Sequence, residues 1–131
     1  MNTIEMPKDH RAIGRILRNP RLWGEHYLKN RDGAARRYWP HQHDDLECPA
    51  TNIIHLDGRD SGKTVDIATL AIHHAFVKKG GSVLVAAPHQ GPLDTIVEEV
   101  EFQIENNPDL QASIAMNAQR RPKIIRKPYF K

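Results

Sequence analysis

Hydrophobic positions in the first thirty residues recur at helical spacing. Residues 10–18 carry Ile13, Ile16 and Leu17 on one side, and Asp9 stands where it can cap the helix. Asn19-Pro20 breaks this pattern, and Pro20 is well placed to open a second helix through "RLWGEHYLKN". The next stretch, "RDGAARRYWPHQHDDLECPAT", is punctuated by glycine and two prolines. This composition predicts a loop that can include one short helical turn.

From Asn52 onward, two continuous apolar runs alternate with amphipathic runs. "NIIHLD" and "SVLVAAP" are short and lack alternation, which predicts two buried strands over 52–57 and 82–88. Apolar stripes predict helices over 63–78 and about 91–106, and Gly80-Gly81 ends the first of them. On the second, we expect the acidic side chains to face solvent: Glu98, Glu99, Glu101 and Glu105.

The end of the chain predicts two more elements. Asn107-Pro108 breaks the long helix, and Asp109 can cap a short helix that carries Leu110 and Ile114. "KIIRKPYFK", at 123–131, has the composition of a strand.

The order strand, helix, strand, helix with tight connections predicts a parallel sheet with right-handed crossovers. The expected fold class is therefore α/β, with a partial parallel sheet flanked by helices. We divide the chain into a basic helical extension over 1–37 and a sheet-containing domain over 38–131.

Length, cysteine content and charge exclude a few classes of protein. The chain has 131 residues, enough for one ordinary domain, and a single cysteine, Cys48, which excludes an internal disulfide and fits a reducing cytoplasm. No window approaches the length of a membrane helix, and the polar start is not a signal peptide. Residues 1–37 hold nine Lys/Arg against four Asp/Glu, and residues 120–131 hold six Lys/Arg and no acid. Basic ends of this kind favour contacts with phosphate or nucleic acid, although solvated surface charge is an equal alternative.

The stretch "LDGRDSGKT", at 56–64, carries the most specific chemistry. Its end matches the G-K-[ST] of a phosphate-binding loop, in which backbone N–H groups surround phosphate oxygens. Lys63 would add charge on the terminal phosphates, and the Thr64 hydroxyl would ligate Mg²⁺. The first glycine of the pattern is displaced by one residue, because Asp57 occupies its place and Gly58 follows. A predicted strand before and an apolar helix after the loop favour a nucleotide site over an ordinary turn.

This loop resembles the modified Walker A motif of viral large terminases, the ATP-driven motors that package DNA. Those loops carry an arginine near their start, relax the first glycine and end in Gly-Lys-Ser/Thr. The resemblance implies that Arg59 approaches the γ-phosphate and assists catalysis. The alternative is a surface ion pair between Arg59 and Asp57 or Asp60. The implied ATP-binding residues of the loop are Asp57, Gly58, Arg59, Asp60, Ser61, Gly62, Lys63 and Thr64.

Two flanking segments extend the resemblance over about residues 20–105. "RYWPHQ" lies upstream of the loop, where terminases and helicases place an adenine-recognising segment. Gln42 could read the adenine edge while Tyr38 or Trp39 stacks on the base, although core aromatics and a surface glutamine explain the residues equally well. Downstream, "VAAPHQGPLDTI" is similar to a segment that these motors use for coupling and DNA contact.

The resemblance implies a RecA-like P-loop core, ATP and Mg²⁺ as cofactors, and double-stranded DNA as the partner. It also implies a homo-oligomeric ring that works with portal and small terminase subunits in the host cytoplasm. No Walker B motif occurs, since the nearest candidate, "TIVEE", lies in a predicted helix. The chain also stops inside the last predicted strand, so we expect an N-terminal part of a longer ATPase and nuclease. Hydrolysis by this chain alone is not expected.

Three other interpretations account for parts of the sequence. A superfamily-two helicase start shares the upstream glutamine and the loop, but helicase loops usually read "TGSGKT"-like, without the arginine. A non-catalytic nucleic-acid-binding fragment would use the loop only for backbone phosphate. A zinc site at His41, His43 and Cys48 lacks a second pair of ligands and is disfavoured.

Overall fold

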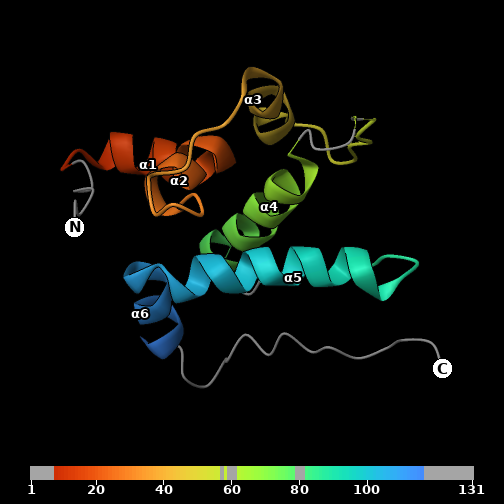
Figure 1. Cartoon of the computed structure of the whole chain (residues 1–131). Helices are drawn as coiled ribbons and strands as arrows, with labels where there is room; N and C mark the ends of the chain where they lie inside the picture. Colours follow the sequence, from red (N-terminus) through yellow and green to blue (C-terminus); the bar gives the residue numbers. More distant parts are fainter. Residues whose placement is uncertain (1–7, 57, 59–61, 79–81, 117–131) are drawn as a thin grey trace.

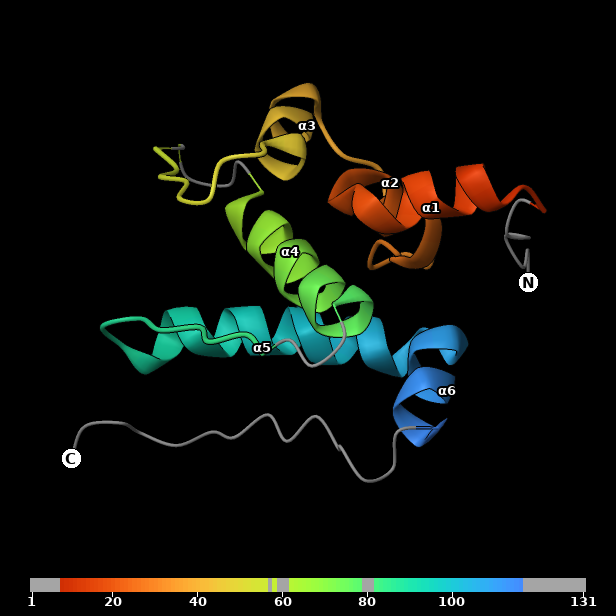
Figure 2. The ribbon, with the colours of Figure 1, turned by 180° about the vertical axis from the view of Figure 1, so that it is seen from behind.

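The computed structural model describes residues 8–56, 58, 62–78 and 82–116, and within these ranges the regular elements are helices. Figure 1 shows α4 crossing α5, with α1 and α2 on one side and α3 above the N-terminal end of α4. The view from behind shows the same arrangement (Figure 2). The helices are α1 (His10–Arg18), α2 (Pro20–Tyr27), α3 (Pro40–Glu47), α4 (Lys63–Val77), α5 (Gln90–Glu105) and α6 (Pro108–Met116).

Capping explains why the first two helices begin where the sequence predicts. The Asp9 carboxylate accepts a hydrogen bond from the Arg11 N–H at 2.9 Å, which confirms the predicted cap of α1. Asn19 separates the two helices and caps α2, because its side chain accepts from two backbone N–H groups. Pro20 opens α2 as predicted, although the helix ends at Tyr27 rather than continuing to residue 30.

The later helices agree closely with the predicted ranges, with two differences. The helices α4 and α5 fall within one residue of their predicted ends. Helix α6 begins at Pro108, so Asp109 lies in its first turn instead of capping it. The stretch predicted as a loop with one short turn contains α3, whose two turns begin at a proline in the first helical position.

The core lies where α2 and α6 meet α4. Its buried members are Trp23, Leu28, Ile72 and Leu110, and partly buried residues from α1 and α5 pack around them. Because these residues come from both sides of position 37, the basic N-terminal helices and the following segment share one apolar cluster.

The predicted α/β fold is wrong for the described residues. No strand or sheet occurs among them, and the only bridge is an isolated one between Lys29 and Ala35. The described parts of the two predicted strands, 52–56 and 82–88, carry large apolar side chains in solvent: Ile54 is 88 % exposed, Leu56 95 % and Leu84 77 %. A strand needs a neighbour for its backbone hydrogen bonds, and neither segment pairs with another segment of the described residues. Segment 52–56 extends away from the helices (Figure 1). The RecA-like core is therefore not seen. The strand predicted at 123–131 lies outside the described residues.

The prediction of a solvent-facing acidic surface on α5 is wrong for Glu99. This side chain is buried, and its carboxylate accepts from Arg36 at 2.6 Å and from Arg31 at 3.0 Å. Gln103, one turn later, donates to the same carboxylate and to the Lys29 carbonyl. A buried charge needs such partners, so this face of α5 is polar because it binds the segment after α2.

The described helices lack the features of a membrane span. None of them has both the length and the apolar character needed to cross a bilayer.

Candidate functional site

The candidate site is the N-terminal end of α4, where the second half of the predicted phosphate loop lies. Gly62 is the N-cap and adopts a left-handed conformation with φ of 86°. Lys63 and Thr64 form the first turn of this 15-residue helix, and both are partly exposed. A glycine cap supplies no side-chain acceptor, so it does not occupy the first-turn N–H groups as Ser or Asp would. The geometry of this end is compatible with an anion.

Gln42 connects α3 to this end of α4. Its Nε2 donates to the Asp66 carboxylate at 2.9 Å and to the Gly62 carbonyl at 3.3 Å, while its Oε1 accepts from the Trp39 N–H at 2.8 Å. A Cβ at position 62 would collide with the Gln42 amide, so glycine is required by close approach as well as by φ. Gln42, the residue predicted to read adenine, thus lies next to the loop. Both polar atoms of its side-chain amide are hydrogen-bonded to other protein groups.

Asp66 is the buried acid of this site. It lies in the first turn of α4 and is only 1 % exposed. Burial, followed by the Asp45 carboxylate, raises the pKa of Asp66 from 3.8 to about 6, while the hydrogen bond from Gln42 acts in the opposite direction. The His55 Nδ1 lies 3.4 Å from the Asp45 carboxylate, so a histidine and a second acid also lie near the start of α4.

The two aromatic residues predicted to stack on a base differ in their surroundings. Tyr38 is buried, and its hydroxyl lies 2.8 Å from the Thr69 hydroxyl on α4. Burial raises the pKa of Tyr38 to about 12, against the opposing hydrogen bond with Thr69. Trp39, in contrast, is 70 % exposed. Of the two rings, Trp39 is the one with a face open to a ligand.

The structure describes part of the predicted phosphate loop. Asp57, Arg59, Asp60 and Ser61 lie outside the described residues. Gly58 is described and exposed, and a side chain at this position would meet nothing within 4 Å. The described part of the loop therefore comprises Gly58 and the Gly62–Thr64 end.

The alternative zinc ligands are not brought together. Cys48 is exposed, while the His43 ring lies 3.1 Å from the Tyr38 carbonyl and 3.9 Å from Glu25. In the part of the chain that the structure describes, no three His, Cys, Asp or Glu side chains form a group suited to a metal ion.

Asp66 is the site residue that sequence reasoning missed. It stands in the first turn of a helix, three residues after Lys63, where an acid is ordinarily explained by the helix dipole. Its position one turn after Gly62 was the available signal, because that spacing places its side chain on the same end of the helix as the loop.

Comparisons with protein-family models, with curated proteins and with solved structures found no match to this chain.

Proposed function

We propose that residues 57–64 bind the phosphates of ATP·Mg²⁺, and that the chain is the ATP-binding part of a DNA-packaging motor of the large-terminase type. In this proposal Lys63 contacts the terminal phosphates, Thr64 ligates Mg²⁺ and Arg59 neutralises charge at the γ-phosphate. Duplex DNA is the partner that is moved. The motor would be a homo-oligomeric ring that works with portal and small terminase subunits in the host cytoplasm.

The observation that carries the proposal is the left-handed Gly62 directly before the helix that begins with Lys63. Gly62, Lys63 and Thr64 therefore lie at the N-terminal, positive end of a 15-residue helix. The aligned peptide dipoles place about half an elementary positive charge there, and the lysine adds a full one. Phosphate is the ligand that this combination suits best.

The base would bind on the α3 side of the loop. Trp39 offers an exposed ring for stacking, and Gln42 lies within hydrogen-bonding distance of Gly62. Reading adenine requires Gln42 to exchange its bonds to Asp66 and Trp39 for bonds to the base. Recognition of adenine is therefore coupled to a rearrangement between α3 and α4.

Calorimetric titration of ATP·Mg²⁺ into the full chain tests the proposal. Lys63→Ala is expected to weaken binding by about tenfold or more, which corresponds to about 1.4 kcal/mol. Lys78→Ala is the matched control, because it removes an exposed lysine just after the other end of the same helix. We expect its affinity to stay within about twofold of the original chain. Equal affinities for Lys63→Ala and the original chain, with both folded by circular dichroism, would remove the loop from the proposal.

A further inference from the structure

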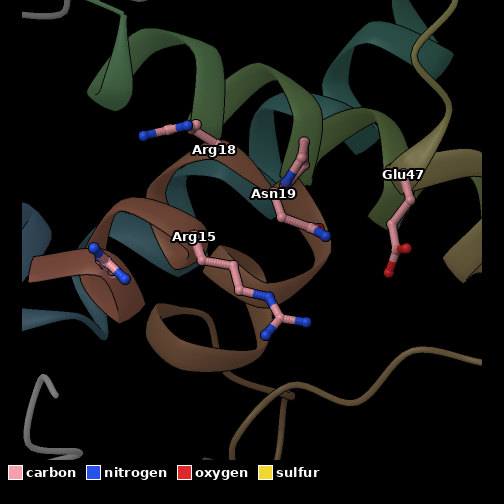
Figure 3. A pocket seen from close by; sticks show the side chains of 6 residues that line it. Arg15, Arg18, Asn19 and Glu47 are labelled. Carbon is pink, nitrogen blue, oxygen red and sulfur yellow. The ribbon is translucent and has the colours of Figure 1, made fainter. Parts of the chain in front are cut away.

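A hollow of about 520 Å³ lies away from the start of α4, between α1, the α1–α2 junction and the end of α3. Figure 3 shows Arg15, Arg18 and Asn19 on one side of it and Glu47 on the other. Arg11 and Pro20 complete the lining. Three of the six lining residues are arginines, and all three come from a single helix.

The spacing of these arginines follows from the sequence of α1. Arg11, Arg15 and Arg18 stand at i, i+4 and i+7, which places them along one face of the helix. At a rise of 1.5 Å per residue, the first and last lie about 10.5 Å apart along the axis. One strand of duplex DNA advances about 3.4 Å per nucleotide along the duplex axis, so a ridge lying parallel to that axis covers about three nucleotide steps.

The charge of the hollow is positive despite its one acid. Glu47 forms a side-chain hydrogen bond and ion pair with Arg21, which lowers the pKa of Glu47. Within the described ranges, no carboxylate pairs with the side chains of Arg11, Arg15 or Arg18, and all three residues are exposed. Three guanidinium groups therefore face solvent beside an acid that is already neutralised.

We propose that Arg11, Arg15 and Arg18 form a docking ridge for the phosphate backbone of duplex DNA. Arginine suits this role because its planar guanidinium can donate two parallel hydrogen bonds to one phosphate. The contacts read no bases, so binding is independent of sequence and depends steeply on salt. The inference rests on the proposed function only for the identity of the partner, and DNA binding at this ridge does not require ATP.

The test measures fluorescence anisotropy of a labelled 20-base-pair duplex with the full chain, without nucleotide, between 50 and 200 mM salt. Arg15→Gln/Arg18→Gln is expected to weaken binding about tenfold or more at 50 mM salt. The plot of log binding constant against log salt concentration should also become less steep by about 1.8, since each phosphate contact contributes about 0.9 to that slope. Glutamine preserves helix propensity, so the fold is expected to survive. Arg15→Lys/Arg18→Lys should recover part of the affinity, because lysine retains the charge without the fork.

The matched control removes the same charge elsewhere. Arg37→Gln/Lys78→Gln takes two exposed cations from outside the hollow and is expected to change affinity less than threefold. Equal weakening by both double variants would overturn the proposal, because it would show that only net charge matters. Absence of duplex binding by the original chain at 50 mM salt would also overturn it.

Two further arms identify the source of the anion. Tight, Arg15/Arg18-dependent binding of pyrophosphate without duplex binding would assign the hollow to a small phosphate ligand and overturn the DNA proposal. If polyglutamate bound as tightly as the duplex, the partner would be an acidic protein rather than DNA.

The experiments distinguish a wrong DNA-binding proposal from a wrong ATP-binding proposal. Lys63→Ala is expected to leave duplex binding intact, and Arg15→Gln/Arg18→Gln is expected to leave ATP·Mg²⁺ binding intact.

Discussion

Gln42 donates a hydrogen bond from its Nε2 to the Asp66 carboxylate at 2.9 Å, and both side chains are buried between α3 and α4. This contact joins α4 to α3, which lies above the start of α4 in Figure 1. Since the same Nε2 also reaches the Gly62 carbonyl, the protonation of Asp66 and the geometry of the loop are linked through one amide group.

The first prediction concerns the pH dependence of stability. The folded state raises the pKa of Asp66 from 3.8 to about 6, so it binds the proton more tightly than the unfolded chain does. The stabilising contribution of the protonated acid is therefore fully present below about pH 4 and is lost as pH rises through about 6. Asp66→Asn imitates the protonated acid at every pH. We expect it to exceed the original chain in unfolding free energy by about 1–2 kcal/mol at pH 7, allowing for screening by solvent.

Urea denaturation at pH 4.5 and pH 7 measures this difference. Asp44→Asn, an exposed acid on α3, is the control, and we expect it to change both midpoints little. An Asp66→Asn advantage that is the same at the two pH values would show that the acid does not titrate in this window.

The helices were predictable because their signals are local. The range of α1 follows from Asp9, three apolar positions and the Asn19-Pro20 break, and all of these lie within twelve residues. The apolar pattern that predicts α4 likewise lies within the residues of that helix. By contrast, α3 has few apolar residues, with Leu46 and Gln42 as its buried members, so periodicity could not reveal it. Its remaining signal was Pro40, which is also compatible with a turn.

The wrong predictions depended on distant partners. An apolar run such as 52–56 does not specify which segment would pair with it, and the exposed Ile54 shows that burial cannot be inferred from apolarity alone. The sequence predicts Glu99 in solvent because it lies off the apolar face of its own helix. Its partner Arg36 lies 63 residues earlier. In the candidate site, Lys63 could be singled out from a motif, whereas the role of Asp66 depends on Gln42, 24 residues away.

The second prediction separates the two roles of Gln42. Gln42→Ala leaves the Asp66 carboxylate and the Trp39 N–H without this partner, so we expect a loss of about 1–3 kcal/mol in unfolding free energy at pH 7. If Gln42 also reads adenine, the variant loses more affinity for ATP than for GTP, because the amide matches only one base edge. Chemical denaturation measures the first effect and calorimetry with both nucleotides the second. An equal loss for ATP and GTP would leave Gln42 as a structural contact only.

The third prediction concerns the contact between α2 and the segment before α3. A Cβ at Gly24 would collide with the Tyr38 hydroxyl and lie 3.1 Å from a methyl group of Thr69. Because Tyr38 and Thr69 are buried and joined by a hydrogen bond, neither can move away easily. Gly24→Ala is therefore expected to lower the unfolding free energy by about 1–3 kcal/mol, the usual cost of overpacking.

A double-mutant cycle with Tyr38→Phe tests this explanation. Removing the hydroxyl takes away the nearest colliding atom, so the double variant should lose less stability than the sum of the two single losses. Additive losses would show that the collision does not cause the destabilisation. Gly14→Ala, in the middle of α1, is the control, since its Cβ would meet only the Arg18 guanidinium at 3.5 Å. We expect this substitution to be neutral or stabilising because alanine favours helix.

The last prediction separates nucleotide binding from hydrolysis. Phosphoryl transfer requires a residue that positions water as well as charges that neutralise the phosphates, and the sequence contains no Walker B acid for the first task. We therefore expect the 131-residue chain to bind ATP·Mg²⁺ with no phosphate release above background in a coupled assay. The background is defined by Lys63→Ala at the same concentration. Robust hydrolysis that disappears in Lys63→Ala would contradict this expectation and direct attention to two acids. Asp57 lies in the loop, and Glu98 is exposed on α5. Replacing each acid by its amide would then identify the catalytic base. Only the replacement of that base should abolish turnover, while the ATP affinity measured by calorimetry stays within about twofold.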